Sequence, residues 1–256
     1  MVALSQTSLG ALPDLHGQIA LVTGASRGIG RSTACVLAAA GARVILLARG
    51  AQSLEAVAED IKAQGGSADL CAADVTEPET FEPALADVLS HTGAPNILVN
   101  CAASGLISRA APVETLSALA MTQDFETKFG GYLRVIQAVL APMRERQYGR
   151  ILNIGGFTLH DPQEPSGFRN AAVAHLTRYL AQQLAPTGVT VVALHPAHAV
   201  ELKQSDANAA PALSGGTDLT YQQVSEAIAH FCGPWASVLN GESILLGGAH
   251  LPVMRY

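Results

Sequence analysis

The chain has 256 residues, of which 49% are hydrophobic and only 14% are charged, with a formal net charge of −6. This composition excludes an intrinsically disordered protein, and the length suits one domain with a sizeable core. With 15 lysines and arginines against 21 acidic residues, the chain lacks the excess of positive charge that is typical of proteins that bind nucleic acids. Aromatic residues make up only 5% of the chain, so small and branched aliphatic residues supply the apolar content, as in a parallel sheet covered on both faces.

We expect a cytoplasmic protein without a membrane partner. No apolar run approaches the roughly 18–20 residues that a membrane span requires. The first 14 residues lack the basic start and the apolar stretch of a signal peptide. The four cysteines, Cys35, Cys71, Cys101 and Cys232, are scattered, which favours free thiols in a reducing compartment. The eight histidines show no metal-binding spacing, so no metal site is expected.

Strand-like and helix-like segments alternate along the chain. Short apolar runs predict strands at residues 18–23, 44–48, 68–73, 97–100, 150–154, 189–194 and 243–246. Helical segments are predicted between them, at residues 30–40, 54–64, 79–92, 122–147, 171–184 and 226–231. This alternation predicts an α/β fold, a Rossmann-type doubly wound parallel sheet with helices on both faces.

The domain organisation is simple. We predict one domain over residues 17–256, preceded by an N-terminal extension of residues 1–16. Residues 197–220 break the alternation, because they have little periodicity and are rich in alanine, serine, aspartate and glycine. Loops at the carboxyl ends of parallel strands form the ligand crevice, so this segment is a candidate lid or substrate loop. A poorly ordered surface excursion is the alternative.

The sharpest motif is Thr-Gly-Ala-Ser-Arg-Gly-Ile-Gly at residues 23–30, between a predicted strand and a predicted helix. Glycines permit a tight turn and let the backbone approach a pyrophosphate, whose negative charge the helix N-terminus attracts. The strand–turn–helix context makes this signal more specific than glycines alone. We therefore predict cofactor binding by Gly24, Ser26, Arg27, Gly28, Ile29 and Gly30.

This motif resembles the cofactor loop of the short-chain dehydrogenase/reductase family, and the resemblance covers nearly the whole chain. Residues 73–75 resemble the family's element that contacts adenine, residues 99–103 its Asn-Asn-Ala-Gly element, and residues 170–185 the helix after its active-site tyrosine. The resemblance implies a nicotinamide cofactor, a small-molecule substrate and a homo-tetramer or dimer. It also implies cofactor contacts by Asp74, Val75, Asn100, Ala102 and Pro196.

Charge predicts NADP(H) rather than NAD(H) as the cofactor. An acidic residue at the end of the second strand would hydrogen-bond the ribose 2′-hydroxyl and repel a 2′-phosphate. That position holds Ala48, followed by Arg49, and Arg27 lies in the glycine turn. Two guanidinium groups near the ribose suit a phosphate. Simple solvation of Arg27 and Arg49 is the alternative.

The catalytic end departs from the family, whose members use serine, tyrosine and lysine with an asparagine on a preceding helix. Matched residue by residue, the serine position holds Gly156, the tyrosine position Ser166 and the lysine position Asn170. Lys128 stands at the asparagine position, so lysine and asparagine are exchanged between two helices that face each other in this fold. We predict that Lys128 restores the positive charge beside the cofactor. A solvated or ion-paired lysine is the alternative.

The exchange leaves no obvious proton donor. Ser166 is a far weaker acid than a phenol. His160 follows the glycine pair at the end of a strand, and an imidazole titrates near neutrality, so His160 is a candidate acid/base. His198 is a weaker candidate, and His195 at a strand end is more typical of a structural role.

Three functions stay open. The first is an NADP(H)-dependent oxidoreductase with a rearranged site that acts on a carbonyl or alcohol; because residues 197–220 lack a charge cluster, an uncharged substrate is favoured. The second is an inactive cofactor-binding subunit in a hetero-oligomer with an active homologue. The third is an isomerase, dehydratase or cyclase that reuses the scaffold. The nucleotide-binding motif favours the first two, and fold-level analogy favours the first.

Overall fold

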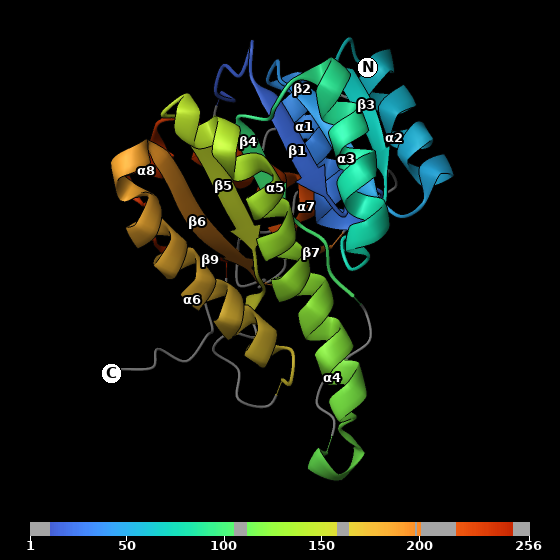
Figure 1. Ribbon diagram of the computed structural model, residues 1–256, viewed down its shortest axis with the longest axis vertical. Coiled ribbons are helices and arrows are strands. Elements are labelled where there is room, and N and C mark those ends of the chain that lie inside the picture. The colour runs from blue at the N-terminus through green and yellow to red at the C-terminus, as the bar shows by residue number, and fades with distance from the viewer. Residues whose placement is uncertain (1–10, 105–111, 158–163, 198, 201–218, 248–256) are drawn as a thin grey trace.

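The structure, a computed structural model, describes residues 11–104, 112–157, 164–197, 199–200 and 219–247. Its middle layer is a seven-stranded sheet with the strand order β3-β2-β1-β4-β5-β6-β9 (Figure 1). Every neighbouring pair in this sheet is parallel. The strands are β1 (Ile19–Thr23), β2 (Arg43–Ala48), β3 (Ser67–Ala72), β4 (Ile97–Asn100), β5 (Gly149–Ile154), β6 (Val189–Pro196) and β9 (Ser243–Leu246). The predicted doubly wound sheet is therefore confirmed, with small shifts at strand ends.

Helices cover both faces of this sheet. The helices are α1 (Gly28–Ala39), α2 (Ala51–Ala63), α3 (Pro78–Thr92), α4 (Ala118–Phe125), α5 (Gly131–Glu145), α6 (Gly167–Leu184), α7 (Tyr221–Cys232) and α8 (Trp235–Val238), of which α4 projects beyond the sheet (Figure 1). Residues of α1, α2 and α7 belong to one buried cluster, and residues of α3, α5 and α6 to a second. Alternation along β1 separates the two cores, because Ala20 and Val22 face the first and Leu21 faces the second.

A long helical stretch was predicted over residues 122–147. The structure has this stretch as α4, a π turn (Glu126–Gly130) and α5 in unbroken succession, with right-handed helical backbone at both joins. Gly131, which follows the π turn, weakens the local preference for an α-helix. A Cβ at Gly131 would lie 2.7 Å from Val75 Cγ2, so glycine allows this close approach. The π turn carries Lys128 on its buried side, and such turns often occur at functional sites.

Three other predicted segments are refined by the structure. Of the candidate lid at residues 197–220, only the ends are described: β7 (Ala199–Val200) pairs in parallel with β8 (Leu219–Thr220), and the rest lies outside the described residues. Helix α7 begins earlier than predicted because Thr220 and Gln223 form a capping box at its start. In the predicted N-terminal extension, Leu15 is part of the buried core.

The sheet topology places a binding crevice near β1 and β4. The chain runs outward from β1 through β2 to β3, and then returns to β4 on the other side of β1. Ligands of open α/β sheets bind outside the carboxyl ends of the strands at such a reversal. Among the described residues, no helix combines the length and apolar character needed to cross a membrane.

Candidate active site

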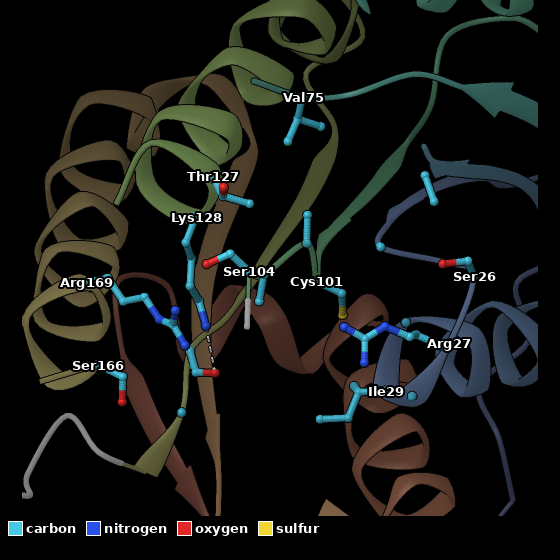
Figure 2. Close-up of a pocket in the computed structure, with 18 of the residues that line it drawn as sticks. Ser26, Arg27, Ile29, Val75, Cys101, Ser104, Thr127, Lys128, Ser166 and Arg169 are labelled. Atoms are coloured by element: carbon cyan, nitrogen blue, oxygen red, sulfur yellow. Dashed lines mark hydrogen bonds between the residues drawn. The ribbon is translucent and has the colours of Figure 1, made fainter. Parts of the chain in front are cut away.

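A cavity of about 980 Å³ lies at the carboxyl ends of the sheet strands (Figure 2). All predicted cofactor residues except Asn100 line it: Gly24, Ser26, Arg27, Gly28, Ile29, Gly30, Arg49, Asp74, Val75, Ala102 and Pro196. The predicted catalytic residues Lys128, Ser166 and Asn170 line the same cavity. His160 lies outside the described residues, as does His198. The structure therefore brings the two predicted halves of the site into one space.

The turn between β1 and α1 is a cradle that side chains would fill. Gly24 and Gly28 adopt φ angles of +65° and +58°, in the region that favours glycine. A Cβ on Gly30 would lie 2.2 Å from Gly24 O, and a Cβ on Gly24 would lie 3.0 Å from Ala102 Cα. No side chain caps the N-terminus of α1, whose first amides face this turn. The arrangement fits the diphosphate of a dinucleotide cofactor.

Hydrogen bonds between strand ends hold this cradle in place. The backbone N–H groups of Cys101 and Ala102 both donate to Thr23 Oγ1, at 3.0 Å each. Asn100, which was predicted to contact the cofactor, does not line the cavity. Its side chain is fully buried and donates from Nδ2 to Asn153 Oδ1 at 3.0 Å. Asn100 therefore braces β4 against β5 beneath the cavity.

Charged side chains occupy the part of the cavity at the end of β2. Arg49 Nη1 lies 3.7 Å from Asp74 Oδ2, and the Arg49 side chain is 82% exposed. The Asp74 carboxylate also accepts hydrogen bonds from Thr76 N at 2.9 Å and from Thr76 Oγ1 at 2.8 Å. Arg27 points into the cavity from the glycine turn (Figure 2). Ala48 places no carboxylate here, so the local charge is compatible with a 2′-phosphate.

The end of β5 carries two glycines against buried polar side chains. A Cβ on Gly155 would lie 2.1 Å from His195 Nδ1, and a Cβ on Gly156 would lie 3.0 Å from Asn170 Nδ2. His195 is buried, and its Nδ1 is 3.3 Å from Gly156 N. This burial is typical of the structural role that was predicted for His195, which stays a prediction. The space beside Gly156 is taken by the Asn170 amide.

Lys128 extends from the π turn into the inner end of the cavity. Its ammonium group donates to Gly155 O at 3.1 Å (Figure 2). Only 4% of Lys128 is exposed. Burial, and then the positive charge of Arg169, lower the pKa of Lys128 from 10.5 to about 7. Lys128 is thus neither solvated nor ion-paired with a carboxylate among the described residues, and it exchanges a proton near neutral pH.

A second charged group beside Lys128 was missed by the sequence reasoning. Arg169, on the first turn of α6, forms an ion pair with the buried carboxylate of Asp124 on α4. Ser104, which follows β4, donates its hydroxyl to the same carboxylate oxygen, Asp124 Oδ1. The only available signal was that both helices place a charged residue on an apolar face, one turn before Lys128 and next to Asn170.

Among the described residues, no tyrosine lines the cavity beside Lys128. Tyr221, at the start of α7, lines the cavity, but a Cβ on Gly28 would lie 3.9 Å from its Cζ, which places its ring at the phosphate turn. Tyr132 is buried outside the cavity, where its hydroxyl donates to Ile154 O at 2.9 Å. The ionisable groups that act on Lys128 are therefore Arg169, Asp124 and Cys101.

Comparison with known proteins gives one consistent result. A family model described as short chain dehydrogenase matches residues 18–208. The reductase NovJ of Streptomyces niveus is 35% identical over 180 residues, which cover 70% of this chain and 68% of NovJ. The 3-oxoacyl-(acyl-carrier-protein) reductase FabG of Vibrio cholerae is 30% identical over 245 residues, 92% of this chain and 98% of FabG. A solved citronellol catabolism dehydrogenase, AtuB of Pseudomonas aeruginosa, superposes with a TM-score of 0.81 at 28% identity, over 94% of this chain and 98% of that one.

Proposed function

Because the chain belongs to the short-chain dehydrogenase family, we propose that it is an NADP(H)-dependent oxidoreductase in which Lys128 replaces the family's tyrosine as the proton donor. The reaction class is the interconversion of a carbonyl and an alcohol on a small molecule. The atypical site consists of Lys128, Ser166 and Asn170 around the inner end of the cavity. His160 stays a second candidate for proton transfer.

The observation that carries this proposal is the place and environment of the Lys128 ammonium group. It is buried at the inner end of the cavity whose outer end holds the glycine turn. An acid/base group works best when its pKa lies near the working pH, and burial brings the pKa of Lys128 to about 7. The hydrogen bond to Gly155 O fixes the side chain and leaves two ammonium N–H bonds for a substrate oxygen.

The cofactor residues fit a nicotinamide dinucleotide with a 2′-phosphate. The β1–α1 turn holds the diphosphate, while Arg27 and Arg49 provide positive charge for the phosphate on the ribose. By resemblance to the family, Asp74 and Val75 would contact adenine and Pro196 would flank the nicotinamide, and all three line the cavity. When bound, the reduced nicotinamide would supply the hydride for the carbonyl carbon. Lys128 then delivers the proton to the carbonyl oxygen, and Ser166 and Asn170 orient it.

A second function, that of an inactive cofactor-binding subunit, is suggested by the residues at the family's catalytic positions. Gly156, Ser166 and Asn170 stand where the family has serine, tyrosine and lysine. In this second reading the chain is a cofactor-binding subunit without turnover, assembled with an active homologue instead of as a homo-tetramer or dimer. An isomerase, dehydratase or cyclase would be a third function, with the cofactor in a structural role.

Turnover and its dependence on Lys128 distinguish these functions. We expect the purified protein to oxidise NADPH with a carbonyl substrate, and Lys128→Met to lower kcat about 100-fold or more. Reduction should weaken as the pH rises above about 7, because the amine loses its proton. Lys62→Met, on the outer face of α2, is the matched control and should leave kcat unchanged.

The opposite outcome is equally clear. Protein that binds NADPH tightly but turns over no member of a broad carbonyl and alcohol panel would overturn the oxidoreductase proposal and favour the subunit. The size of the protein expressed alone would then be compared with its size when it is expressed with the products of neighbouring genes, and a difference would identify a mixed oligomer. Failure to bind either nicotinamide cofactor would remove both readings.

A further inference from the structure

The inner end of the cavity contains two cationic side chains that converge. Lys128 enters from the π turn and Arg169 from α6, and the two point toward each other near Gly155 (Figure 2). Both are largely buried, with 4% of Lys128 and 16% of the Arg169 side chain exposed. Like charges held together away from water are unfavourable unless an opposite charge accompanies them.

The described residues supply one carboxylate for these two cations. Asp124 Oδ1 pairs with Arg169 and accepts the Ser104 hydroxyl, while no ion pair joins Asp124 to Lys128 among the described residues. Glu164 also lines the cavity, but no ion pair joins it to either cation among the described residues. Burial raises the pKa of the Cys101 thiol to about 12, so this neighbour of Lys128 is neutral. With Lys128 protonated, the inner end therefore carries an unmatched positive charge.

Hydrogen-bond capacity is also left over at this place. An ammonium group has three donors and a guanidinium group has five. Lys128 uses one for Gly155 O, and Arg169 uses Nη1 for Asp124. Arg169 Nε is buried without a partner among the described residues. A planar guanidinium with spare donors matches a carboxylate, and an ammonium beside it matches a single oxygen.

From this arrangement we infer that the substrate is a 2-oxo acid, or in the reverse direction a 2-hydroxy acid, whose carboxylate binds Arg169 and whose carbonyl oxygen binds Lys128. This inference rests on the proposed function and names its substrate class. It replaces the uncharged substrate predicted from residues 197–220, because the charge cluster is built by α4, the π turn and α6 instead.

The chemical step balances with the groups present. The carbonyl carbon accepts a hydride and is reduced to an alcohol carbon as the dihydronicotinamide is oxidised, and the π electron pair moves to the carbonyl oxygen. Lys128 transfers one ammonium proton to that oxygen, and its neutral amine is reprotonated from solvent. Arg169 holds the carboxylate, which is unchanged, so one 2-oxo acid, one hydride from the dihydronicotinamide and one proton become one 2-hydroxy acid.

A binding measurement tests the substrate class without any turnover. Oxamate is an unreactive anion that resembles a 2-oxo acid, and oxamide is its uncharged counterpart. Isothermal titration calorimetry of the NADPH-saturated protein should show oxamate binding about tenfold or more tightly than oxamide. Binding of oxamate should take up protons above about pH 7, because the anion raises the pKa of Lys128, which burial and Arg169 lower and which Asp124 and Cys101 already raise in part.

Variants assign the effect to the two cations. Lys128→Met and Arg169→Lys should each weaken oxamate about tenfold or more and leave oxamide unchanged. Arg43→Lys is the matched control, because Arg43 pairs with Asp69 through Nε and Nη2 outside the cavity. Arg169→Lys leaves the buried Asp124 with a poorer partner. The double variant Asp124→Asn/Arg169→Gln removes both charges of the ion pair together, and it therefore tests the need for the Arg169 cation in a folded protein.

Each outcome has one meaning. Equal affinity for oxamate and oxamide, or oxamate affinity unchanged by Lys128→Met, overturns the inference. Oxamate selectivity without turnover of any 2-oxo acid supports the anion site and contradicts the proposed function. Reduction of neutral ketones with no preference for oxamate would support the proposed function and contradict the anion site.

Discussion

Two neighbouring glycines at the end of β5 differ in what surrounds them. A side chain on Gly155 would meet the ring of His195, which is buried within β6. A side chain on Gly156 would meet the end of the Asn170 amide at 3.0 Å, where a small rotation restores contact. Neither glycine has a positive φ, so packing alone decides what each position accepts. The missing serine at position 156 is therefore a change of chemistry, and the glycine at 155 is a requirement of packing.

This difference predicts unequal stabilities. Gly155→Ala should lower the free energy of unfolding by about 1–3 kcal/mol, because the His195 ring must shift in a packed core. Gly156→Ala should change it by less than about 1 kcal/mol. Urea unfolding of both variants beside the unmodified protein measures the two values. Equal losses would show that His195 yields as easily as the Asn170 amide.

At the scale of single residues, the sequence predicts only part of the catalytic end. The motif match located Lys128, Ser166 and Asn170, and all three line the cavity. It could not locate Arg169 and Asp124, because their pairing joins two helices, α4 and α6, that are separated in sequence by the π turn, α5 and β5. Which charged side chains meet in the core is a property of the tertiary structure.

Among the elements, the turns at the ends of β1 and β2 are the parts most open to prediction. Glycine conformations and close backbone approaches depend on a few local residues, so the turn between β1 and α1 could be read from residues 23–30. Long helices are harder, because periodicity does not reveal where one is interrupted. The π turn between α4 and α5 is followed by Gly131, where a side chain would meet Val75, a residue that lies far away in sequence.

The end of β2 gives a prediction about cofactor choice. Ala48 lines the cavity beside Arg49 and Asp74. In Ala48→Asp the new carboxylate would repel a 2′-phosphate and accept a hydrogen bond from a 2′-hydroxyl. We expect the ratio of NADPH to NADH affinity to fall about tenfold or more, measured by fluorescence titration of both cofactors. Ala63→Asp, exposed at the end of α2, is the control. A parallel loss of both affinities would mean that this end of β2 does not face the ribose phosphate.

For the whole molecule, the order of elements was enough to predict the architecture. Alternating strands and helices imply a parallel sheet covered on both faces, and the parallel sheet implies one edge where all carboxyl ends meet. The position of the cavity follows from this topology. The electrostatic state of the cavity does not, because it depends on how deeply the fold buries Lys128.

That burial links the stability of the whole molecule to pH. The pKa of Lys128 is about 7 in the folded protein, against 10.5 without burial. Below pH 7 both states carry the proton and the folded state bears the full penalty of a buried charge. Between pH 7 and pH 10.5 the unfolded chain binds the Lys128 proton and the folded protein does not. The contribution of Lys128 to the free energy of unfolding therefore rises with pH, by up to about 1.4 kcal/mol per pH unit.

The comparison of two variants isolates this contribution. Burial raises the pKa of the Cys71 thiol from 9.0 to about 11, and this shift lowers the stability of the protein above pH 9. The contribution of Lys128 is therefore best measured between pH 7 and pH 9. Over this range, the stability of Lys128→Met relative to the unmodified protein should fall steadily in urea unfolding, because methionine carries no proton. Lys62→Met, on the exposed face of α2, should keep a constant difference. If the curves for Lys128→Met and the unmodified protein ran parallel, Lys128 would keep its proton across this range and would be a poor acid for a reaction near neutral pH.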